Sequence, residues 1–322
     1  MKSKRSFWKE LPSPFWSLAP MEDVTDTVFR QIVISCGRPH VLFTEFTSVE
    51  GLDSEGKEKV SYRLKYRENE HPIVAQIWGT TPEAHFKAAC LIRELGFDGV
   101  DINMGCPVKK IVKQGACSAL IENHELTKEI VVATKEGAKN LPVSVKTRIG
   151  FKRRVTKEWA GFLLSLGLDA LTIHGRIAAE MSKTPANWEE IGKVVRLRNQ
   201  MGVDTPIVGN GDVMNLLQAQ ELVYKYRVDG IMFGRAIFKN PWLFNSAVNI
   251  EDIGVSTKLD LLKKHVLMFE ETWGCLKNFD LMKKFFKVYV NDFAGASDLR
   301  NSLMNCENVK EVITFVDLYT KG

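Results

Sequence analysis

The sequence lacks the features of several protein classes. Its six cysteines include no C-x-x-C pair and no close histidine cluster, so neither a structural zinc nor any other metal site is expected, and the thiols are predicted to be free. No apolar run approaches the roughly 20 residues of a membrane-spanning helix. The basic N-terminus is not followed by an apolar segment, which argues against a secretory signal. We therefore expect a cytoplasmic protein without membrane contact.

Repeats longer than a strand–helix unit, low-complexity segments and a Rossmann-type dinucleotide fingerprint are also missing. The hydrophobic content of 45% and the charged content of 26% are ordinary for a soluble globular protein. The net charge of +5 is too small to identify a partner. Local basic clusters at 109–113 and 152–154 carry more information, although each taken alone is more often a solvated face.

Eight short runs rich in β-branched or apolar residues recur over the first 235 positions. They occupy residues 17–19, 41–46, 73–77, 99–103, 143–147, 170–174, 206–210 and 230–234. Segments with helical periodicity lie between most of them, and Gly96 and Gly167 are placed to end two of these helices. In the segment 81–96, a stripe from Phe86 to Arg93 is predicted to lie on the sheet. The repeated alternation predicts an α/β fold, a (β/α)8 TIM barrel, rather than an open doubly wound sheet.

The pattern changes after Trp242. No convincing strand follows, and apolar residues recur at helical spacing. The stripes are Leu261, His265, Met268 and Phe269; Met282, Phe285, Phe286 and Tyr289; and Val309, Val312, Ile313 and Val316. We therefore predict a barrel domain over residues 1–248 and a small all-α helical bundle over residues 249–322.

Polar residues that are unusual in apolar strands follow the predicted strands at one end. In a TIM barrel the active site lies at the carboxyl ends of the strands. These residues are Pro20, Met21, Gln76, Asn103, Lys146, His174, Asn210 and Arg235. Each alone has an ordinary structural explanation, such as a hydrogen-bonded core histidine for His174. Their occurrence at the same end of successive strands indicates a site.

Two glycine-containing turns, at 208–213 and 233–241, follow the last two predicted strands. Such turns free backbone N–H groups for a phosphate, which barrels commonly bind at this place. Gln76 and Asn103 can bond the carbonyls and nitrogens of a flat ring, and Lys146 can stabilise a ring position that becomes anionic on reduction. Flavin mononucleotide (FMN) meets these requirements, whereas a sugar phosphate explains only the glycine turns.

Cys106 stands between Gly105 and Pro107 in the stretch DINMGCPVKK, residues 101–110. A buried structural cysteine would lie inside the apolar run. On a turn the thiol can be presented to a ligand, and the alternative is an inert turn cysteine.

These motifs together resemble those of the tRNA-dihydrouridine synthases. DINMGCPVKK is accompanied, in order, by APMEDVTD (19–26), VKTRIGF (145–151), TIHGR (172–176), GNGD (209–212) and FGRA (233–236). The lysine pair and the GACSAL stretch are most similar to the bacterial B-type branch. The chain departs from the family at Cys117, where members often have glycine in Ala-Gly-Ser, and at Asn187, which precedes Trp188 where the family usually has aspartate.

The resemblance implies that the chain reduces the C5–C6 bond of uridine in tRNA. A hydride from reduced FMN would reach C6, a proton from Cys106 would reach C5, and NADPH or NADH would be the reductant. The implied cofactor contacts are Pro20, Met21, Glu22, Gln76, Asn103, Lys146, His174, Asn210, Gly211, Asp212, Gly234 and Arg235. A monomer is expected.

The target base must leave its stack, which costs a few kcal/mol, and cations around the barrel mouth would offset this by holding the RNA backbone. The predicted tRNA contacts are Lys109, Lys110, Lys113, Lys152, Arg153, Arg154 and Arg176 on the barrel, and Lys283, Lys284, Lys287 and Arg300 on the helical domain. Because cations favour thiolate over thiol, we expect Lys109 and Lys110 to point away from the sulfur.

Two alternatives remain from the sequence. One is a flavin barrel that acts on a free pyrimidine, as in dihydroorotate dehydrogenases. The other is a non-redox RNA-binding protein on a barrel scaffold.

Overall fold

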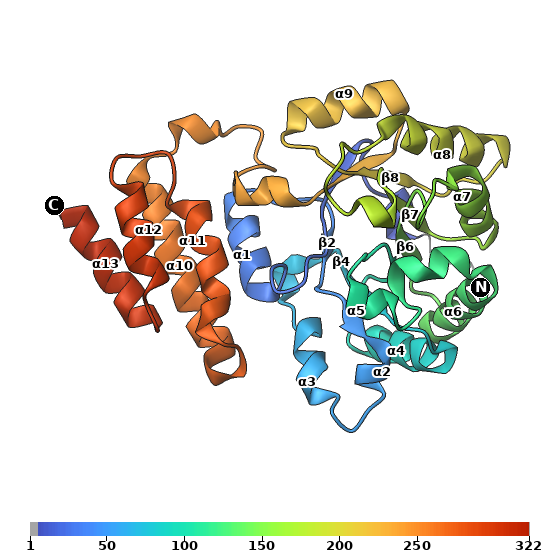
Figure 1. Cartoon of the computed structure of the whole chain (residues 1–322), viewed down its shortest axis with the longest axis horizontal. Coiled ribbons are helices and arrows are strands. Elements are labelled where there is room, and N and C mark those ends of the chain that lie inside the picture. Colours follow the sequence, from blue (N-terminus) through green and yellow to red (C-terminus); the bar gives the residue numbers. More distant parts are fainter. Residues whose placement is uncertain (1–5, 322) are drawn as a thin grey trace. The chain divides into compact units, whose positions relative to one another are not determined.

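Parallel strands form a nearly closed barrel in the computed structural model, which describes residues 6–321 (Figure 1). The strands are β1 (Phe15–Leu18), β2 (Leu42–Phe43), β3 (Thr47–Ser48), β4 (Ile73–Trp78), β5 (Gly99–Met104), β6 (Val143–Arg148), β7 (Ala170–His174), β8 (Ile207–Asn210) and β9 (Gly230–Phe233). Their order is β1-β9-β8-β7-β6-β5-β4-β2, with β3 also paired to β4. A bridge between Ser17 and Val41 joins β1 to the residue before β2. The predicted TIM barrel is therefore confirmed.

The second predicted strand, 41–46, is shorter in the structure, where only β2 falls within that range and β3 begins just beyond it. Between them, Thr44 Oγ1 accepts the hydrogen bond of the Gln76 backbone N–H at 3.1 Å. A side chain thus takes the place of a main-chain carbonyl, and the regular ladder is interrupted there. The other seven predicted strands agree with the observed bounds to within two residues. The basic residues 1–5, on which the argument against a secretory signal partly rests, lie outside the described residues.

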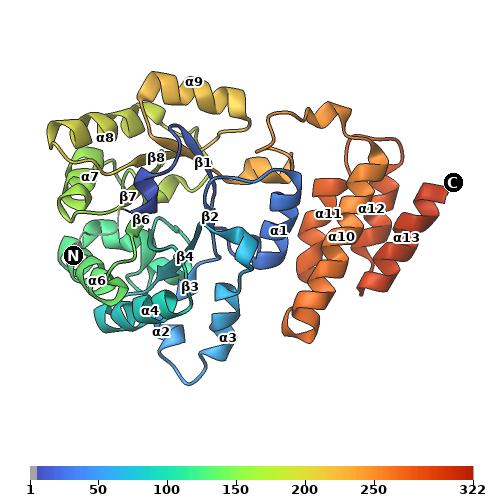
Figure 2. The same cartoon turned by 180° about the vertical axis from the view of Figure 1, so that it is seen from behind.

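Helices surround the strands of the barrel, and α4, α6, α7, α8 and α9 are seen on its outside in both views (Figures 1 and 2). The helical elements here are η1 (Phe7–Lys9), α2 (Val49–Leu52), α3 (Glu58–Ser61), η2 (Tyr62–Leu64), η3 (Glu68–Glu70), α4 (Pro82–Glu94), α5 (Lys109–Val112), η4 (Cys117–Glu122), α6 (His124–Ala138), α7 (Thr156–Ser165), η5 (Ala178–Glu180), α8 (Trp188–Gln200) and α9 (Leu216–Tyr226). Gly96 (φ 84°) and Gly167 (φ 66°) follow α4 and α7 in left-handed conformations, as predicted.

The face of α4 that packs on the sheet differs from the prediction. Ala84, Ala88 and Ile92 are buried, whereas Phe86 is 41% exposed. The predicted stripe faces α6 instead, since Arg93 Nη1 donates a hydrogen bond of 2.5 Å to the carbonyl of Gly137. A pattern of periodicity 3.6 identifies an apolar face but not the neighbour that covers it.

The chain separates into two compact units, and each is described by itself. The barrel unit contains the described residues up to Thr25 and Pro39–Gly234, and the helical unit contains Asp26–Arg38 and the described residues from Arg235 onward. This division differs from the sequence-based boundary at 248/249 in two places. The segment that follows β1 joins the helical unit, and the carboxyl part of that unit begins directly after β9.

The helical unit consists of α1 (Thr27–Cys36), η6 (Arg235–Phe238), η7 (Ile250–Asp252), α10 (Val255–Trp273), η8 (Gly274–Leu276), η9 (Phe279–Met282), α11 (Lys283–Tyr289), α12 (Ala296–Met304) and α13 (Val309–Lys321). The bundle expected from the apolar stripes is present, and Phe29 of α1 packs on Phe285 of α11 with ring centroids 4.9 Å apart. α12 lies outside the predicted stripes. In the part of the chain described here, no helix combines the length and the apolar character required to cross a bilayer.

Candidate active site

The register of the sheet brings the predicted site residues to one end of the barrel. Asn103 of β5 is aligned with Lys146 of β6, and His174 of β7 is aligned with Asn210 of β8. Gln76 of β4 is aligned with Asp101 of β5, which lies two residues before Asn103 on the same strand. Because parallel strands share one polarity, all of these side chains lie near the carboxyl ends of their strands.

A chain of hydrogen bonds links β4, β5 and β6 below this end. Asn103 Nδ2 donates to Gln76 Oε1 at 3.0 Å, and Gln76 Nε2 donates to Asp101 Oδ2 at 2.7 Å. Ser144 Oγ donates to the other oxygen of Asp101 at 2.6 Å. The carboxylate therefore fixes the orientation of the Gln76 amide, because only the NH2 group of that amide can face it.

Asp101 was not among the predicted site residues, and it is fully buried. Burial raises its pKa from 3.8 to about 6, although the donors Ser144 and Gln76 and the charge of Lys146 act in the opposite direction. Its position inside an apolar strand did not identify it as a site residue. A buried aspartate at that place could equally accept hydrogen bonds from a neighbouring turn.

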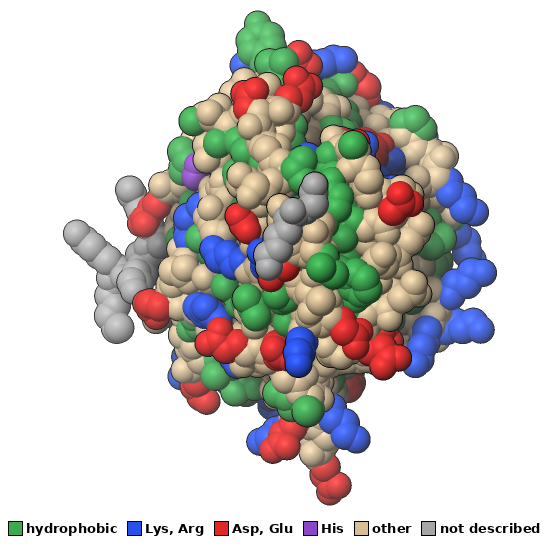
Figure 3. All heavy atoms as spheres, turned by 90° about the vertical axis from the view of Figure 1, so that its left-hand side faces the viewer, with side chains coloured by type: hydrophobic (Ala, Val, Ile, Leu, Met, Phe, Trp, Pro, Cys, Tyr) green, Lys and Arg blue, Asp and Glu red, His purple; other side chains and the backbone are tan. Residues whose placement is uncertain are grey.

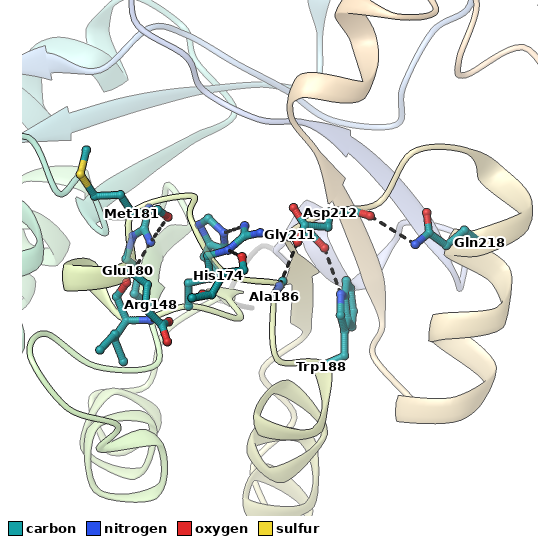
Figure 4. A network of polar contacts seen from close by, with 12 residues as sticks. Arg148, His174, Glu180, Met181, Ala186, Trp188, Gly211, Asp212 and Gln218 are labelled. Atoms are coloured by element: carbon teal, nitrogen blue, oxygen red, sulfur yellow. Dashed lines mark hydrogen bonds and ion pairs between the residues drawn. The ribbon is translucent and has the colours of Figure 1, made fainter.

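Asn103 determines the course of the turn that carries Cys106. Its Oδ1 accepts hydrogen bonds from the backbone N–H groups of Gly105 and Cys106, both at 3.0 Å. Arg148, at the end of β6, holds the same turn from the other side, because its Nε donates to the carbonyl of Gly105 at 2.7 Å. The Arg148 Nη1 also bonds the carbonyls of Ile177 and Met181, at 3.2 and 3.0 Å (Figure 4).

The half-buried thiol of Cys106 lies beside a second cysteine. The pKa of Cys106 is lowered from 9.0 to about 7, first by a hydrogen bond from the Cys117 thiol. Burial opposes this change, while the backbone N–H of Val108 and the charges of Arg148 and Lys146 contribute to it. Arg148 was not predicted at this place, and the two cations that act on the sulfur belong to β6 rather than to the lysine pair of the motif.

Lys146 is a half-buried cation at the carboxyl end of β6. Burial and the charge of Arg148 lower its pKa from 10.5 to about 8, while Asp101 and Cys106 raise it. Its Nζ donates a hydrogen bond of 3.3 Å to Asn210 Oδ1, and Asn210 Nδ2 in turn donates to the carbonyl of Met232 at 2.7 Å. An ammonium group of this kind is stabilised by a nearby anion.

The turn after β8 is fixed by a polar network (Figure 4). Asp212 forms an ion pair with Arg176 and accepts the backbone N–H of Ala186 at 2.9 Å. Gly211 has φ 126°, and a Cβ added there would lie 2.6 Å from the Cβ of Ala186. Glycine is therefore required at this position. The indole N–H of Trp188 donates to the Gly211 carbonyl at 3.0 Å.

Arg176 does not lie at the surface as a tRNA contact would. Its side chain is 3% exposed, and besides Asp212 it contacts His174, with 3.1 Å between Nη1 and Nε2. The Arg176 charge is thus used inside the barrel to hold the turn of Asp212 and the ring of His174. This correction could not be read from the HGR motif, which gives the residue type but not its direction.

The first predicted contact segment, after β1, is held in two ways. The backbone N–H of Met21 donates to Thr25 Oγ1 at 2.9 Å. The carboxylate of Glu22 pairs with Arg63 at 2.6 Å, so one of its oxygens is used within the protein. Glu22 and Arg63 also line a mainly apolar cavity of about 260 Å³, together with Trp78.

The remaining predicted cations of the barrel unit are exposed on segments that follow strands. Lys109, Lys110 and Lys113 belong to α5 and its end, after β5, and residues 152–154 follow β6. They therefore lie on the same end of the barrel as Cys106.

In the helical unit, Lys283 pairs with Asp280 at 2.7 Å, and Arg300 Nη1 donates to the Val290 carbonyl at 2.6 Å. Lys284 and Lys287 are exposed. Seen from the side of α13, the molecule shows basic, acidic and apolar side chains intermixed (Figure 3). Whether the cations of this unit bind RNA stays a prediction.

Comparison with known proteins agrees with the motifs. The family model described as Dihydrouridine synthase (Dus) matches residues 17–321. The probable tRNA-dihydrouridine synthase of Staphylococcus aureus strain Mu50 is 42% identical over 317 residues, which cover 98% of this chain and 95% of that protein. The probable tRNA-dihydrouridine synthase 2 of Bacillus subtilis strain 168 is 43% identical over 315 residues, covering 97% and 96%.

Solved structures with a similar fold are more distant. Histamine dehydrogenase from Rhizobium sp. 4-9 superposes with a TM-score of 0.55 at 14% sequence identity, covering 79% of this chain and 48% of that one. At this level of identity the likeness concerns the fold alone.

Proposed function

The chain belongs to the dihydrouridine synthase family, and we propose on this basis that it reduces specific uridines of tRNA to 5,6-dihydrouridine, with FMN as cofactor and NADPH or NADH as reductant. The observation that carries the proposal is the position of Cys106, half-buried on a rigid turn beside Lys146 at the carboxyl ends of the strands. A cytoplasmic location and a monomeric state stay predictions.

The residues present fit a flavin. Lys146 is half-buried, its pKa is lowered to about 8, and its single hydrogen bond among the described side chains is the one to Asn210. Such a group gains stability beside a ring that becomes negatively charged. An added Cβ at Gly234 would come no closer than 3.9 Å to a neighbouring atom, Ala19 Cβ, so the protein does not crowd the backbone of the turn after β9, where we propose the phosphate to lie. When bound, the flavin supplies the hydride.

The protein itself contributes a proton donor and its orientation. In the proposed reaction Cys106 donates a proton to C5 of the uracil, a form of general-acid catalysis that typically accelerates a reaction on the order of 10²- to 10⁴-fold. Asn103 and Arg148 hold the two sides of its turn, so the thiol needs little reorganisation. With a pKa of about 7, roughly half of the thiols carry the proton at pH 7, and the donor is lost as the pH rises.

The exposed cations of 109–113 and 152–154 are proposed to hold the RNA backbone while the target base leaves its stack. Arg176 is left out of this set because it is buried and paired with Asp212. The names of the relatives favour tRNA over a free pyrimidine, and the barrel site favours an enzyme over a passive RNA-binding protein.

Purified protein tests the proposal directly. With tRNA that lacks dihydrouridine and with NADPH, the wild-type protein should be yellow and should produce tRNA nucleosides two hydrogens heavier than uridine. Cys106→Ala should keep the flavin absorption but form little product. NADPH oxidation with orotate and not with tRNA would favour the free-pyrimidine alternative, and a colourless protein that takes up no flavin would refute the proposal.

A further inference from the structure

Cys106 and Cys117 form a pair of thiols that differ in their access to solvent. Cys106 is half-buried at the mouth of the barrel, and Cys117 is fully buried at the start of η4. The backbone N–H of Ser118 donates to the carbonyl of Cys106 at 3.3 Å, which holds the two segments side by side. The thiol of Cys117 donates its hydrogen to the sulfur of Cys106.

Cys117 also occupies an unfavourable backbone conformation. Its φ of 54° is in the left-handed region, where glycine is preferred and residues with a Cβ are uncommon. A thiol is thus kept at a position where the backbone alone favours glycine. Strain of this kind at a site is a reason to look for a function of the side chain.

We propose that Cys106 and Cys117 are an oxidation-sensitive pair, which a peroxide converts to a disulfide that stops proton donation until a dithiol reduces it. Redox-sensitive cysteines are characteristically accessible thiolates placed next to a second, resolving cysteine. The formation of the disulfide is independent of the proposed function, whereas the loss of activity rests on it.

The first step takes place at Cys106. A peroxide reaches this sulfur but not the fully buried Cys117, and the thiolate is the reactive form. One peroxide oxygen is transferred to the sulfur, giving a sulfenic acid, and the other leaves as water after protonation.

The second step forms the disulfide. Burial is the main reason that the pKa of Cys117 is raised, and the hydrogen bond and negative charge of Cys106 raise it further. These two contributions of Cys106 end when the thiolate becomes a neutral sulfenic acid. The sulfur of Cys117 then attacks the sulfur of Cys106. The S–O bond breaks, the S–S bond forms, and hydroxide leaves with the proton of Cys117 as a second water. In total, two thiols lose two electrons to one peroxide, and a dithiol returns them.

Peptide mapping of the full-length protein tests the disulfide without reference to activity. Lys109, Lys110 and Lys113 lie between the two cysteines, so trypsin separates Cys106 from Cys117 unless a disulfide joins the peptides. After brief treatment with hydrogen peroxide, the wild-type protein should give a peptide pair linked through these residues, and dithiothreitol should release it. Cys275→Ser removes the exposed cysteine and should leave the linked pair unchanged.

Activity measurements on Cys117→Gly and Cys117→Ser complete the test. Glycine suits the left-handed backbone and serine keeps the size of the side chain, so failure of one variant to fold leaves the other. Wild-type protein should lose dihydrouridine formation with peroxide and regain it with dithiothreitol. After prolonged treatment with excess peroxide both variants should recover less than wild type, since the sulfenic acid of Cys106 without a resolving thiol reacts with a second peroxide to give sulfinic acid, which dithiothreitol does not reduce. Absence of the linked peptide from oxidised wild-type protein, or equal recovery in variants and wild type, would overturn the proposal.

Discussion

Asp101→Asn should make the stability of this protein less dependent on pH. The carboxyl of Asp101 is fully buried, and its pKa is raised from 3.8 to about 6, mainly by burial. A group whose pKa is higher in the folded state binds its proton more tightly there. Its contribution to stability is therefore complete below the unfolded pKa near 4 and is lost as the pH rises through about 6.

The size of the effect follows from the two pKa values. Between pH 4.5 and pH 7.5 the wild-type protein should lose about 2 kcal/mol of unfolding free energy through this group. Asparagine cannot titrate, yet it can keep both contacts, because its oxygen accepts from Gln76 and its NH2 group can donate to the Ser144 hydroxyl. The range ends at pH 7.5 because Lys146 has a pKa of about 8 and is mostly deprotonated only above that value.

Urea unfolding at matched pH values measures the effect. The unfolding free energy of Asp101→Asn minus that of wild type should increase by about 2 kcal/mol from pH 4.5 to pH 7.5. Glu129→Gln on α6, an exposed carboxyl, serves as the control and should show no such trend. A constant difference for Asp101→Asn, or an equal trend in the control, would refute the assignment of the raised pKa to burial.

Three further predictions concern the site. The rate of alkylation of Cys106 by iodoacetamide should be half-maximal near pH 7. Cys117→Ala should move this midpoint to higher pH because it removes the main hydrogen bond to the sulfur, and an unchanged midpoint would contradict that contact. Replacing residues 152–154 with glutamates should weaken tRNA binding in a filter assay at moderate salt while the flavin absorption is retained, and equal binding would exclude these cations from the RNA contact. Gly211→Ala should lower the unfolding free energy by roughly 2 kcal/mol and reduce flavin retention. The control Gly202→Ala is also at positive φ but has no atom within 4 Å of the added Cβ, so it should keep the flavin. Unchanged flavin retention in Gly211→Ala would contradict the tight packing of this turn.

The barrel could be predicted because strand and helix signals alternate regularly, and seven of eight strands were placed to within two residues. The exceptions have local causes. The second strand ends earlier than predicted because the Thr44 hydroxyl takes over a backbone hydrogen bond, and no periodicity reveals such a substitution. The polar segment 51–64 forms only short helices, since it has no continuous apolar face.

The site residues at strand ends could be predicted because strand polarity brings them together without any knowledge of packing. The supporting residues could not. Asp101 accepts a hydrogen bond from Gln76, and Arg148 donates one to the carbonyl of Gly105. The buried Arg176 is paired with Asp212. Spacing along the chain specifies which face of a strand a residue occupies, but not the partner that a long side chain reaches across the barrel.

Helix α1 has a consequence for how the chain folds during synthesis. It follows β1, yet it belongs to the helical unit, where Phe29 packs on Phe285. At roughly 5 to 20 residues per second, a ribosome needs on the order of 10 to 50 s to make the intervening chain, and Phe29 lacks its partner Phe285 during that time. A polypeptide that ended after β9 would lack the helix on which Phe29 packs, so the helical unit can be completed only when the C-terminal segment has been made.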